Sequence, residues 1–279
     1  MTSAFVLIDK PEGITSFRTL RGIKTQFGTK RVGHAGTLDQ AASGLIVAAV
    51  GKCTRLLPYI EAQEKVYSFN LHFGILTDTL ELAGNILKQD SNAARTAEEV
   101  NAVLQAFVGE IEQVPPVYSA IKINGKRASD LALKGQNIEL KPRYAYISEL
   151  KMLPISNTPH SNLLYPLYCR CSKGTYIRSL ARDIAEKLGT CGVADKIRRL
   201  AIGGISVERA SDKPILPQEL FNWEIAEIKE EDAKKILNGM PIVNSVLSAS
   251  KSMAFVSNKG QIIAVAECQN GYLVPRFLL

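Results

Sequence analysis

The stretch Gly33-His34-Ala35-Gly36-Thr37-Leu38-Asp39 is the part of the sequence around which the chain is organised. Its two glycines can adopt backbone angles that other residues avoid. An apolar run, AASGLIVAAV at 41–50, follows and has the composition of a buried element. A loop braced by a buried element can hold a reactive side chain in fixed geometry. The acid that ends the loop, Asp39, is therefore either reactive or the cap of a turn.

Strand and helix patterns alternate irregularly outside this stretch. Thr15 or Ser16 can cap a first helix, and Gly189 can end a later one. Strands outnumber helices and strict βαβ alternation is absent, which predicts an α+β fold with a mixed, largely antiparallel sheet flanked by helices. Strands are predicted over residues 4–8, 65–73, 121–127, 138–153, 164–171 and 193–207, and helices over 15–25, 51–61, 96–107, 128–134 and 176–188.

The strand predicted at 65–73 carries Lys65 and Tyr67 at the start of a face that then becomes apolar. Such a face can open into a cleft at its beginning. Alternation alone favours the other interpretation, a core tyrosine beside a rim lysine.

The C-terminal part of the chain differs in pattern. Residues 211–218 carry two prolines, so we expect a linker over 211–229 after a domain at 1–210. Beyond it, a helix at 230–237 and short strands form a β-rich unit at 230–279. A unit of this size buries too little surface to be securely stable alone.

The composition favours a nucleic-acid partner. Lys and Arg number 34 against 27 Asp and Glu, a net charge of +7. This excess favours a polyanion, with nucleic acid first and a membrane surface second, and a basic protein without such a partner remains an alternative. No apolar run approaches the ~20 residues needed to span a bilayer, and the N-terminus lacks a signal-peptide layout. We expect a monomeric cytoplasmic protein.

Metal and cofactor chemistry are poorly supported. The five cysteines are scattered, and the one close pair, Cys169 and Cys171, has no second pair or histidine nearby. Buried, reduced strand cysteines are the favoured interpretation. The sequence contains no Gly-x-Ser-x-Gly elbow, no P-loop and no Gly-x-Gly-x-x-Gly after a strand. We therefore expect no metal and no cofactor.

An acid in a glycine loop, a strand tyrosine and a helix-start arginine remain as candidates. A carboxylate with a reference pKa of about 3.9 is ionised at neutral pH. The Asp39 side chain could thus attack an electrophilic carbon without a general base. Arg178 beside it would hold it ionised and aimed. These properties permit a site, but they do not by themselves bring the three residues together.

Six motifs, in order, cover roughly residues 4–205. They are VLIDKPEGITS at 6–16, GHAGTLD at 33–39, Lys65-Val66-Tyr67, residues 74–84 with Thr77-Asp78-Thr79, Pro115-Pro116-x-Tyr118-Ser119-Ala120-x-Lys122, and Gly174-Thr175-Tyr176-Ile177-Arg178-Ser179-Leu180. In this combination the chain resembles the TruB-type tRNA pseudouridine synthases. Residues 234–241 resemble the start of a shortened PUA-type RNA-binding domain.

The resemblance implies conversion of uridine 55 in the TΨC arm of tRNA to pseudouridine, without metal or cofactor. Asp39 matches the catalytic aspartate, which forms a covalent adduct with the target nucleoside. Attack at uracil C6 and attack at ribose C1′ are both compatible with a carboxylate. Arg178 would pair with Asp39. Tyr67 would stack on the flipped uracil and help to remove the C5 proton.

Other positions of the family's pocket can also be matched. Tyr176 and Leu200 would line the uracil pocket, and Lys65 would support it. His34 would fill the place that the flipped base leaves, or contact the RNA beside it. The chain departs from the family at Gln40, where proline is usual and would stiffen the chain. Residue 81 is Glu instead of the usual Asp, at a position expected outside the pocket.

Two alternatives remain at this level. One is a non-catalytic RNA-binding or RNA-folding protein on the same scaffold, against which the joint presence of Asp39, Tyr67 and Arg178 argues. The other is a guide-RNA-directed relative, against which the short C-terminal unit and the absence of basic tails argue.

Overall fold

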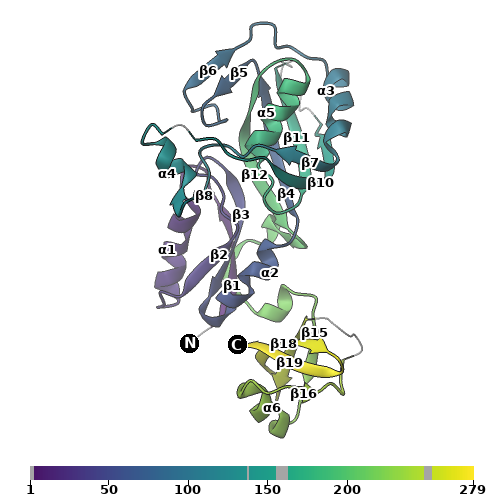
Figure 1. Cartoon of the computed structure of the whole chain (residues 1–279). Coiled ribbons are helices and arrows are strands. Elements are labelled where there is room, and N and C mark those ends of the chain that lie inside the picture. Colours follow the sequence, from purple (N-terminus) through teal and green to yellow (C-terminus); the bar gives the residue numbers. More distant parts are fainter. Residues whose placement is uncertain (1–2, 137, 155–162, 248–252) are drawn as a thin grey trace.

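The computed structural model describes residues 3–136, 138–154, 163–247 and 253–279. These residues form a larger part around a ten-stranded sheet and a smaller part around a five-stranded sheet, which lie one above the other in Figure 1. Among the described residues, no helix is both long and apolar enough to cross a membrane.

The large sheet is mixed and mainly antiparallel, as predicted. Its order is β14-β1-β3-β12-β4-β11-β10-β7, with β2 paired to β3 and β13 paired to β12. The predicted strands at 65–73 and 164–171 are confirmed as β4 and β11. The strands of this sheet are β1 (Ala4–Lys10), β2 (Val32–Ala35), β3 (Ser43–Val50), β4 (Lys65–Phe73), β7 (Gly109–Gln113), β10 (Arg143–Met152), β11 (Leu164–Cys171), β12 (Gly192–Ile202), β13 (Ile205–Ser206) and β14 (Ser211–Ile215).

The parallel pair of this sheet joins β3 to β12, where Ser43 lies opposite Arg198 and Gly44 opposite Arg199. We call this contact the seam. Gly44 has a φ of +103°, and a Cβ there would lie 2.2 Å from the carbonyl oxygen of Arg199. A side chain at this position would push the two strands apart. The glycine therefore permits the close approach that unites the two antiparallel halves of the sheet.

Helices cover the large sheet and are capped as the sequence predicts. Thr15 accepts a hydrogen bond from the backbone N–H of Arg18, and Thr96 forms a reciprocal capping box with Glu99. The helices are α1 (Ser16–Gln26), α2 (Leu57–Glu61), α3 (Ala97–Leu104), α4 (Ala128–Ala132), α5 (Ile177–Lys187) and α6 (Glu230–Leu237). Short 3₁₀ segments occupy Gly51–Leu56, Gln105–Phe107, Val207–Arg209 and Pro217–Glu219.

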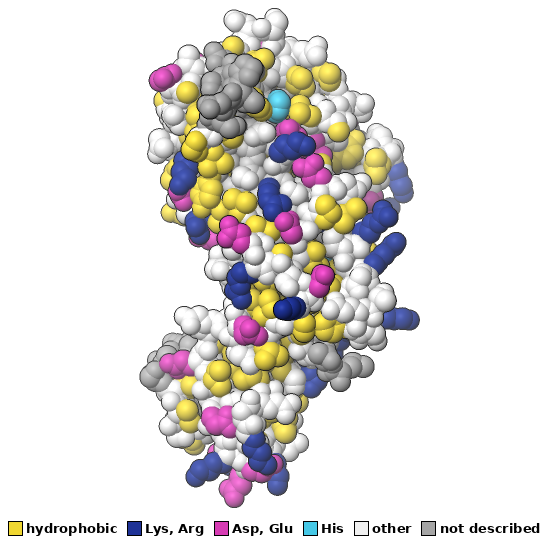
Figure 2. Space-filling model, turned by 180° about the vertical axis from the view of Figure 1, so that it is seen from behind, with side chains coloured by type: hydrophobic (Ala, Val, Ile, Leu, Met, Phe, Trp, Pro, Cys, Tyr) yellow, Lys and Arg dark blue, Asp and Glu magenta, His cyan; other side chains and the backbone are white. Residues whose placement is uncertain are grey.

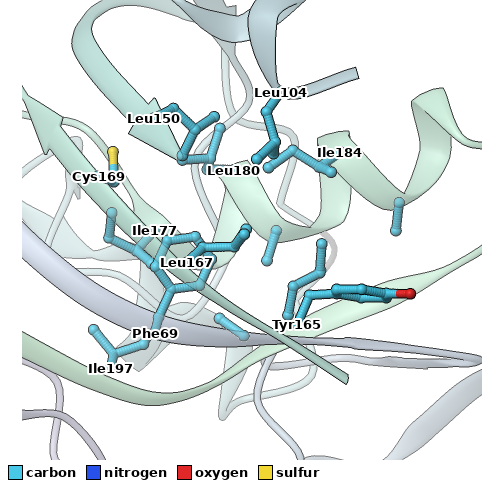
Figure 3. Packing of buried hydrophobic residues seen from close by; sticks show 14 of the residues in the cluster. Phe69, Leu104, Leu150, Tyr165, Leu167, Cys169, Ile177, Leu180, Ile184 and Ile197 are labelled. Atoms are coloured by element: carbon cyan, nitrogen blue, oxygen red, sulfur yellow. The ribbon is translucent and has the colours of Figure 1, made fainter. Parts of the chain in front are cut away.

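Helix α5 lies across the sheet and carries one apolar face. Its residues Ile177, Leu180 and Ile184 recur at helical spacing and are buried against Phe69 of β4 and Leu167 of β11 (Figure 3). Burying each such side chain contributes about 1.5–3 kcal/mol. This packing fixes the start of α5 relative to β4, and the candidate site lies there.

The smaller part contains α6 and a sheet of order β15-β17-β18-β19-β16. An aromatic cluster joins it to the large sheet: Phe221 contacts Phe5 of β1 with ring centroids 6.1 Å apart, and Trp223 lies 5.2 Å from both Tyr59 and Phe255. The strands are β15 (Glu224–Glu227), β16 (Ile242–Val243), β17 (Met253–Asn258), β18 (Gln261–Gln269) and β19 (Tyr272–Leu278), and two separate hairpins are β5 (Ile75–Thr77) with β6 (Ile86–Gln89) and β8 (Lys122–Ile123) with β9 (Lys126–Arg127).

Three local predictions are wrong. The linker expected over 211–229 contains β14, which pairs with β1, and β15, which pairs with β17. Residues 32–35 form β2 rather than a loop, because they pair with β3. The helix expected over 51–61 is divided into a 3₁₀ segment and α2, with Pro58 in the first turn of α2. In the first two cases the strands form because they pair with residues far along the chain. A local sequence pattern does not contain this information.

Candidate active site

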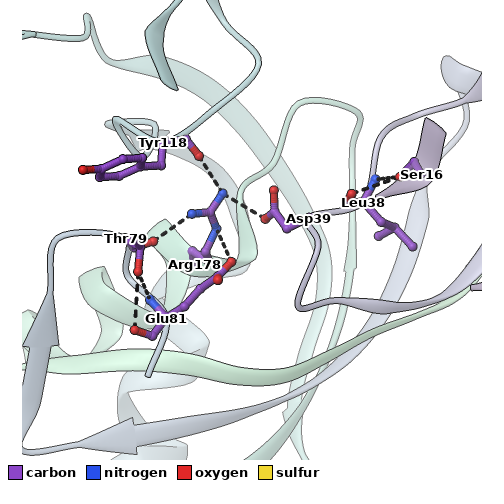
Figure 4. A network of polar contacts seen from close by, with 7 residues as sticks. All are labelled: Ser16, Leu38, Asp39, Thr79, Glu81, Tyr118 and Arg178. Carbon is purple, nitrogen blue, oxygen red and sulfur yellow. Dashed lines mark hydrogen bonds and ion pairs between the residues drawn. The ribbon is translucent and has the colours of Figure 1, made fainter. Parts of the chain in front are cut away.

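Asp39 lies in the loop between β2 and β3, beside the start of α5. Its Oδ2 is 2.9 Å from Nη2 of Arg178, and its side chain is 43% exposed (Figure 4). Arg178 in contrast is only 4% exposed. An arginine held in this way orients a neighbouring carboxylate while leaving it accessible to a substrate.

Two loops aim the Arg178 side chain. Its Nη1 donates to the carbonyl of Thr79 at 2.7 Å, and its Nη2 donates to the carbonyl of Tyr118 at 2.9 Å (Figure 4). Both loops belong to motifs that the sequence analysis singled out. The guanidinium can therefore hardly turn away from Asp39 without breaking bonds to buried backbone.

Glu81 shares the same arginine. As expected, it lies outside the inner pocket that Asp39 and Tyr67 line, and it reaches Arg178 from the outer cleft. Its Oε1 is 3.5 Å from Nε of Arg178, and Glu81 and Asp39 line a common cleft. Burial raises the pKa of Glu81, the Arg178 charge lowers it, and the Asp39 charge raises it. The sequence signal was present, since residue 81 belongs to a matched motif, but no local pattern placed it against Arg178.

A small inner pocket of about 110 Å³ brings together most of the predicted residues. Asp39, Tyr67, Tyr176 and Arg178 line it. Burial raises the pKa of both phenols, so each is neutral at neutral pH. The apolar wall from β12 is Ile197, three residues before the predicted Leu200, which is not among the lining residues. The position of Leu200 was carried over from a motif whose spacing varies, and this accounts for the offset.

Lys65 lies at the start of β4 but outside the lining of the inner pocket. It is 6% exposed and donates to the backbone carbonyls of Glu61 and Gln63. Burial, with the nearby Arg199 charge, lowers the pKa of Lys65 to about 8. These contacts tie the start of β4 to the turn that follows α2, so the side chain supports the strand that carries Tyr67.

His34 lines a larger cleft of about 790 Å³, which also contains Asp39, Tyr118 and Arg127. Its Nδ1 is buried and has no hydrogen-bond partner among the described residues. Burial and the charge of Arg199 lower the pKa of His34, so the imidazole is neutral at neutral pH. A neutral ring, with its Nδ1 turned inward, therefore lines the cleft that contains Asp39.

Hydrogen bonds brace the loop around Asp39 on both sides. Ser16 Oγ donates to the carbonyl of Leu38 at 3.0 Å and accepts from its N–H at 2.9 Å. Gln40 Nε2 donates to the carbonyl of Gly13 at 2.9 Å, and the Gly13 N–H donates to the carbonyl of Gln40 at 2.9 Å. Gln40 thus ties the chain to the β1–α1 loop at the position where the family usually has a proline.

The described residues contain no group of three His, Cys, Asp or Glu side chains placed to hold a metal ion. A partly exposed carboxylate is held by a buried arginine, and two phenols line the same small pocket. This combination suits nucleophilic attack on a flat ring or on the sugar attached to it.

Comparison with known proteins agrees with this geometry. A family model described as "TruB family pseudouridylate synthase (N terminal domain)" matches residues 24–177. The chain is 33% identical over 298 residues to tRNA pseudouridine synthase B of Caulobacter sp. (strain K31), covering 98% of this chain and 94% of that protein. It is 37% identical over 271 residues to tRNA pseudouridine synthase B of Borreliella afzelii (strain PKo), covering 95% of each.

Solved structures share the fold. A chain in a Cbf5-Nop10-Gar1 complex matches with a TM-score of 0.67 and 17% identity, covering 99% of this chain and 84% of that one. A chain in an H/ACA RNP bound to a substrate RNA containing 2'-deoxyuridine matches with a TM-score of 0.68 and the same identity and coverage. The extent of the sequence matches, together with the fold, shows that the chain belongs to the TruB family of pseudouridylate synthases.

Proposed function

We propose that this chain isomerises uridine 55 in the T-arm of tRNA to pseudouridine, as a cytoplasmic monomer without metal or cofactor. The observation that carries the proposal is the Asp39–Arg178 ion pair at the mouth of a pocket lined by Tyr67 and Tyr176. Family membership and the relatives named tRNA pseudouridine synthase B support it.

The target base must first leave the folded T-arm. Flipping a nucleotide costs a few kcal/mol, and stacking on an aromatic ring offsets part of it. Tyr67 would supply that ring in the inner pocket, and Ile197 would contact the base from the β12 side. His34, on the wall of the outer cleft, would fill the vacated place or contact the RNA beside it.

Asp39 would then act as the nucleophile. Its carboxylate attacks either uracil C6 or ribose C1′, the bond between N1 and C1′ breaks, and the base turns. A bond then forms between C5 and C1′, C5 loses its proton, and N1 gains one. The bond to Asp39 breaks again: C5 displaces the carboxylate if it is on C1′, and loss of the C5 proton expels it if it is on C6. Arg178 keeps the carboxylate charged before attack and oriented throughout, because three other groups hold its guanidinium in place.

Incubation of the full chain with an unmodified tRNA transcript, followed by mapping of pseudouridine at nucleotide resolution, tests the proposal. We expect modification at position 55 and at no other uridine. A chain that binds the transcript without forming pseudouridine would instead support the non-catalytic RNA-binding alternative.

Substitution of Tyr67 by leucine is expected to separate turnover from binding. The ring that stacks on the flipped base is lost, whereas the outer cleft is unchanged, so the single-turnover rate should fall by about 100-fold or more while tRNA affinity changes by a few fold. Single-turnover kinetics and filter binding measure the two quantities. Equal losses in both would identify Tyr67 as a packing residue only.

The affinity for tRNA is expected to depend steeply on salt. Exposed basic residues of α1 and of the β8–β9 hairpin, among them Arg18, Arg21 and Lys126, flank the outer cleft. Viewed from behind in Figure 2, lysines and arginines project from the edge that carries α1 and α4 in Figure 1. Between about 50 and 200 mM salt we expect affinity to fall by at least tenfold, as measured by fluorescence anisotropy. A flat titration would contradict phosphate-led binding.

A further inference from the structure

Arg199 is a buried arginine to which the proposed reaction assigns no role. It is 1% exposed and is the largest of the almost completely buried side chains among the described residues. None of the ion pairs between described residues includes it. A buried cation without a carboxylate is costly, and an apolar side chain of similar volume would stabilise the fold better. Its position next to a reactive pocket therefore points to a functional task.

The guanidinium is bonded to the loop that carries Asp39. Arg199 Nη2 donates to the carbonyl of Gly36 at 3.0 Å, and its Nε donates to the carbonyl of Leu45 on β3 at 2.8 Å. Gly36 has a φ of +70°, and a Cβ there would lie 3.3 Å from Nη1 of Arg199. The arginine thus holds the loop backbone three residues before the nucleophile, on the inner side of the seam.

The same guanidinium reaches Tyr67. The two residues lie directly opposite each other in the β12–β4 pair. Arg199 lowers the pKa of the Tyr67 phenol by its charge and by a hydrogen bond, against the larger raising effect of burial. The neighbours of Arg199 include two lysines and a histidine that can be protonated. The Arg199 charge lowers the pKa of all three, which are His34, Lys65 and Lys10. One buried cation therefore contacts the nucleophile loop and the tyrosine of the pocket.

We propose that Arg199 is a positioning residue that holds the Asp39 loop and the Tyr67 phenol in one frame and stabilises the phenolate that accepts the C5 proton. The inference rests on the proposed function. The phenol first loses its proton to water. The phenolate oxygen then takes the proton from C5, the electron pair of the C5–H bond returns to the ring, and the neutral phenol is restored.

The test uses the full chain, an unmodified tRNA transcript with uridines deuterated at C5, and single-turnover kinetics at saturating enzyme. Arg199→Met, Tyr67→Phe and the double variant are compared with the unsubstituted chain. Arg198→Met is the matched control, since Arg198 is the adjacent residue and pairs with Asp9 on the surface. We expect Arg199→Met to slow turnover by about 100-fold or more, which is the contribution typical of one group acting in proton transfer, and Arg198→Met to leave turnover unchanged.

Two readouts separate positioning from mere packing. Slower proton removal should make a primary isotope effect appear or grow in Arg199→Met. In the Tyr67→Phe background, which lacks the hydroxyl, Arg199→Met should reduce the rate much less. The reason is that both substitutions remove the same function, proton transfer to the phenolate. Equal losses in both backgrounds with an unchanged isotope effect would overturn the inference. Absence of pseudouridine with the unsubstituted chain would instead overturn the proposed function itself.

Arg199→Lys and Arg199→Gln provide the comparison if Arg199→Met does not fold. The lysine variant keeps the charge, whereas the glutamine variant keeps only a neutral hydrogen-bond donor. The lysine variant should therefore turn over at least about tenfold faster than the glutamine variant, which corresponds to a difference of one pKa unit at the phenol. Equal rates for the two folded variants would contradict a role for the charge.

Discussion

Asp39→Asn is expected to abolish pseudouridine formation while leaving tRNA binding nearly intact. The amide is nearly isosteric and can still accept a hydrogen bond from Arg178, so the loop geometry should persist. It is not a nucleophile under these conditions, and loss of a covalent catalyst costs roughly four orders of magnitude or more in rate. Single-turnover assays on the unmodified transcript measure the loss, and filter binding measures the affinity.

Asp212→Asn is the matched control for that substitution. Asp212 is exposed on β14 and lines neither the outer cleft nor the inner pocket, so the same change from acid to amide is made outside the site. It should retain full activity. Appreciable turnover by Asp39→Asn, in protein free of deamidated aspartate, would rule out a covalent role for this carboxylate.

Arg178→Met is expected to produce the second-largest loss of activity. Removing the guanidinium leaves the carbonyls of Thr79 and Tyr118 without their donor and leaves two carboxylates, Asp39 and Glu81, facing each other. Mutual repulsion raises the pKa of at least one of them. We expect a rate loss of roughly 1,000-fold or more, because preorganised electrostatics and nucleophile ionisation are lost together.

The same substitution should also destabilise the fold. Breaking a buried ion pair by deleting one partner costs about 3–5 kcal/mol, and the exposure of Asp39 places the expected cost toward the lower end. Arg182→Met, one turn later on α5, removes a contact to the carbonyl of Val114 outside the inner pocket. If both variants lost activity in proportion to stability, Arg178 would have only a structural role.

Local patterns in the sequence predicted much of the fold. The alternation in residues 65–73 and 164–171 and the cap at Thr15 are determined by near neighbours, so β4, β11 and α1 could be predicted directly. β14 could not, because this five-residue segment, with three polar residues and a proline, becomes a strand only when β1 is beside it. Patterns of this kind record which side of a strand is apolar, not which strand it meets.

The candidate site also has a part that could be predicted from the sequence and a part that could not. The motifs supplied Asp39, Tyr67, Tyr176 and Arg178, and all four line one pocket. The contacts of Glu81 and Arg199 could not be predicted, because both side chains bind residues that are distant in sequence. Arg199 follows Arg198 in a strand, where successive side chains point to opposite faces. This alternation implies that one of the two arginines is buried, but it does not show which one. Their roles became visible only when burial and partners were known.

The seam also governs when a folding chain becomes an enzyme. Leu45 and Arg199 bond to each other although 154 residues separate them in sequence. Contacts of such high sequence separation pay a large loop-closure entropy and tend to form late. Each antiparallel half of the sheet can gather its hairpins first, with Asp39 in one half and Tyr67 in the other. Catalytic competence therefore requires registration of the seam, and recovery of activity during refolding reports that step rather than the formation of secondary structure.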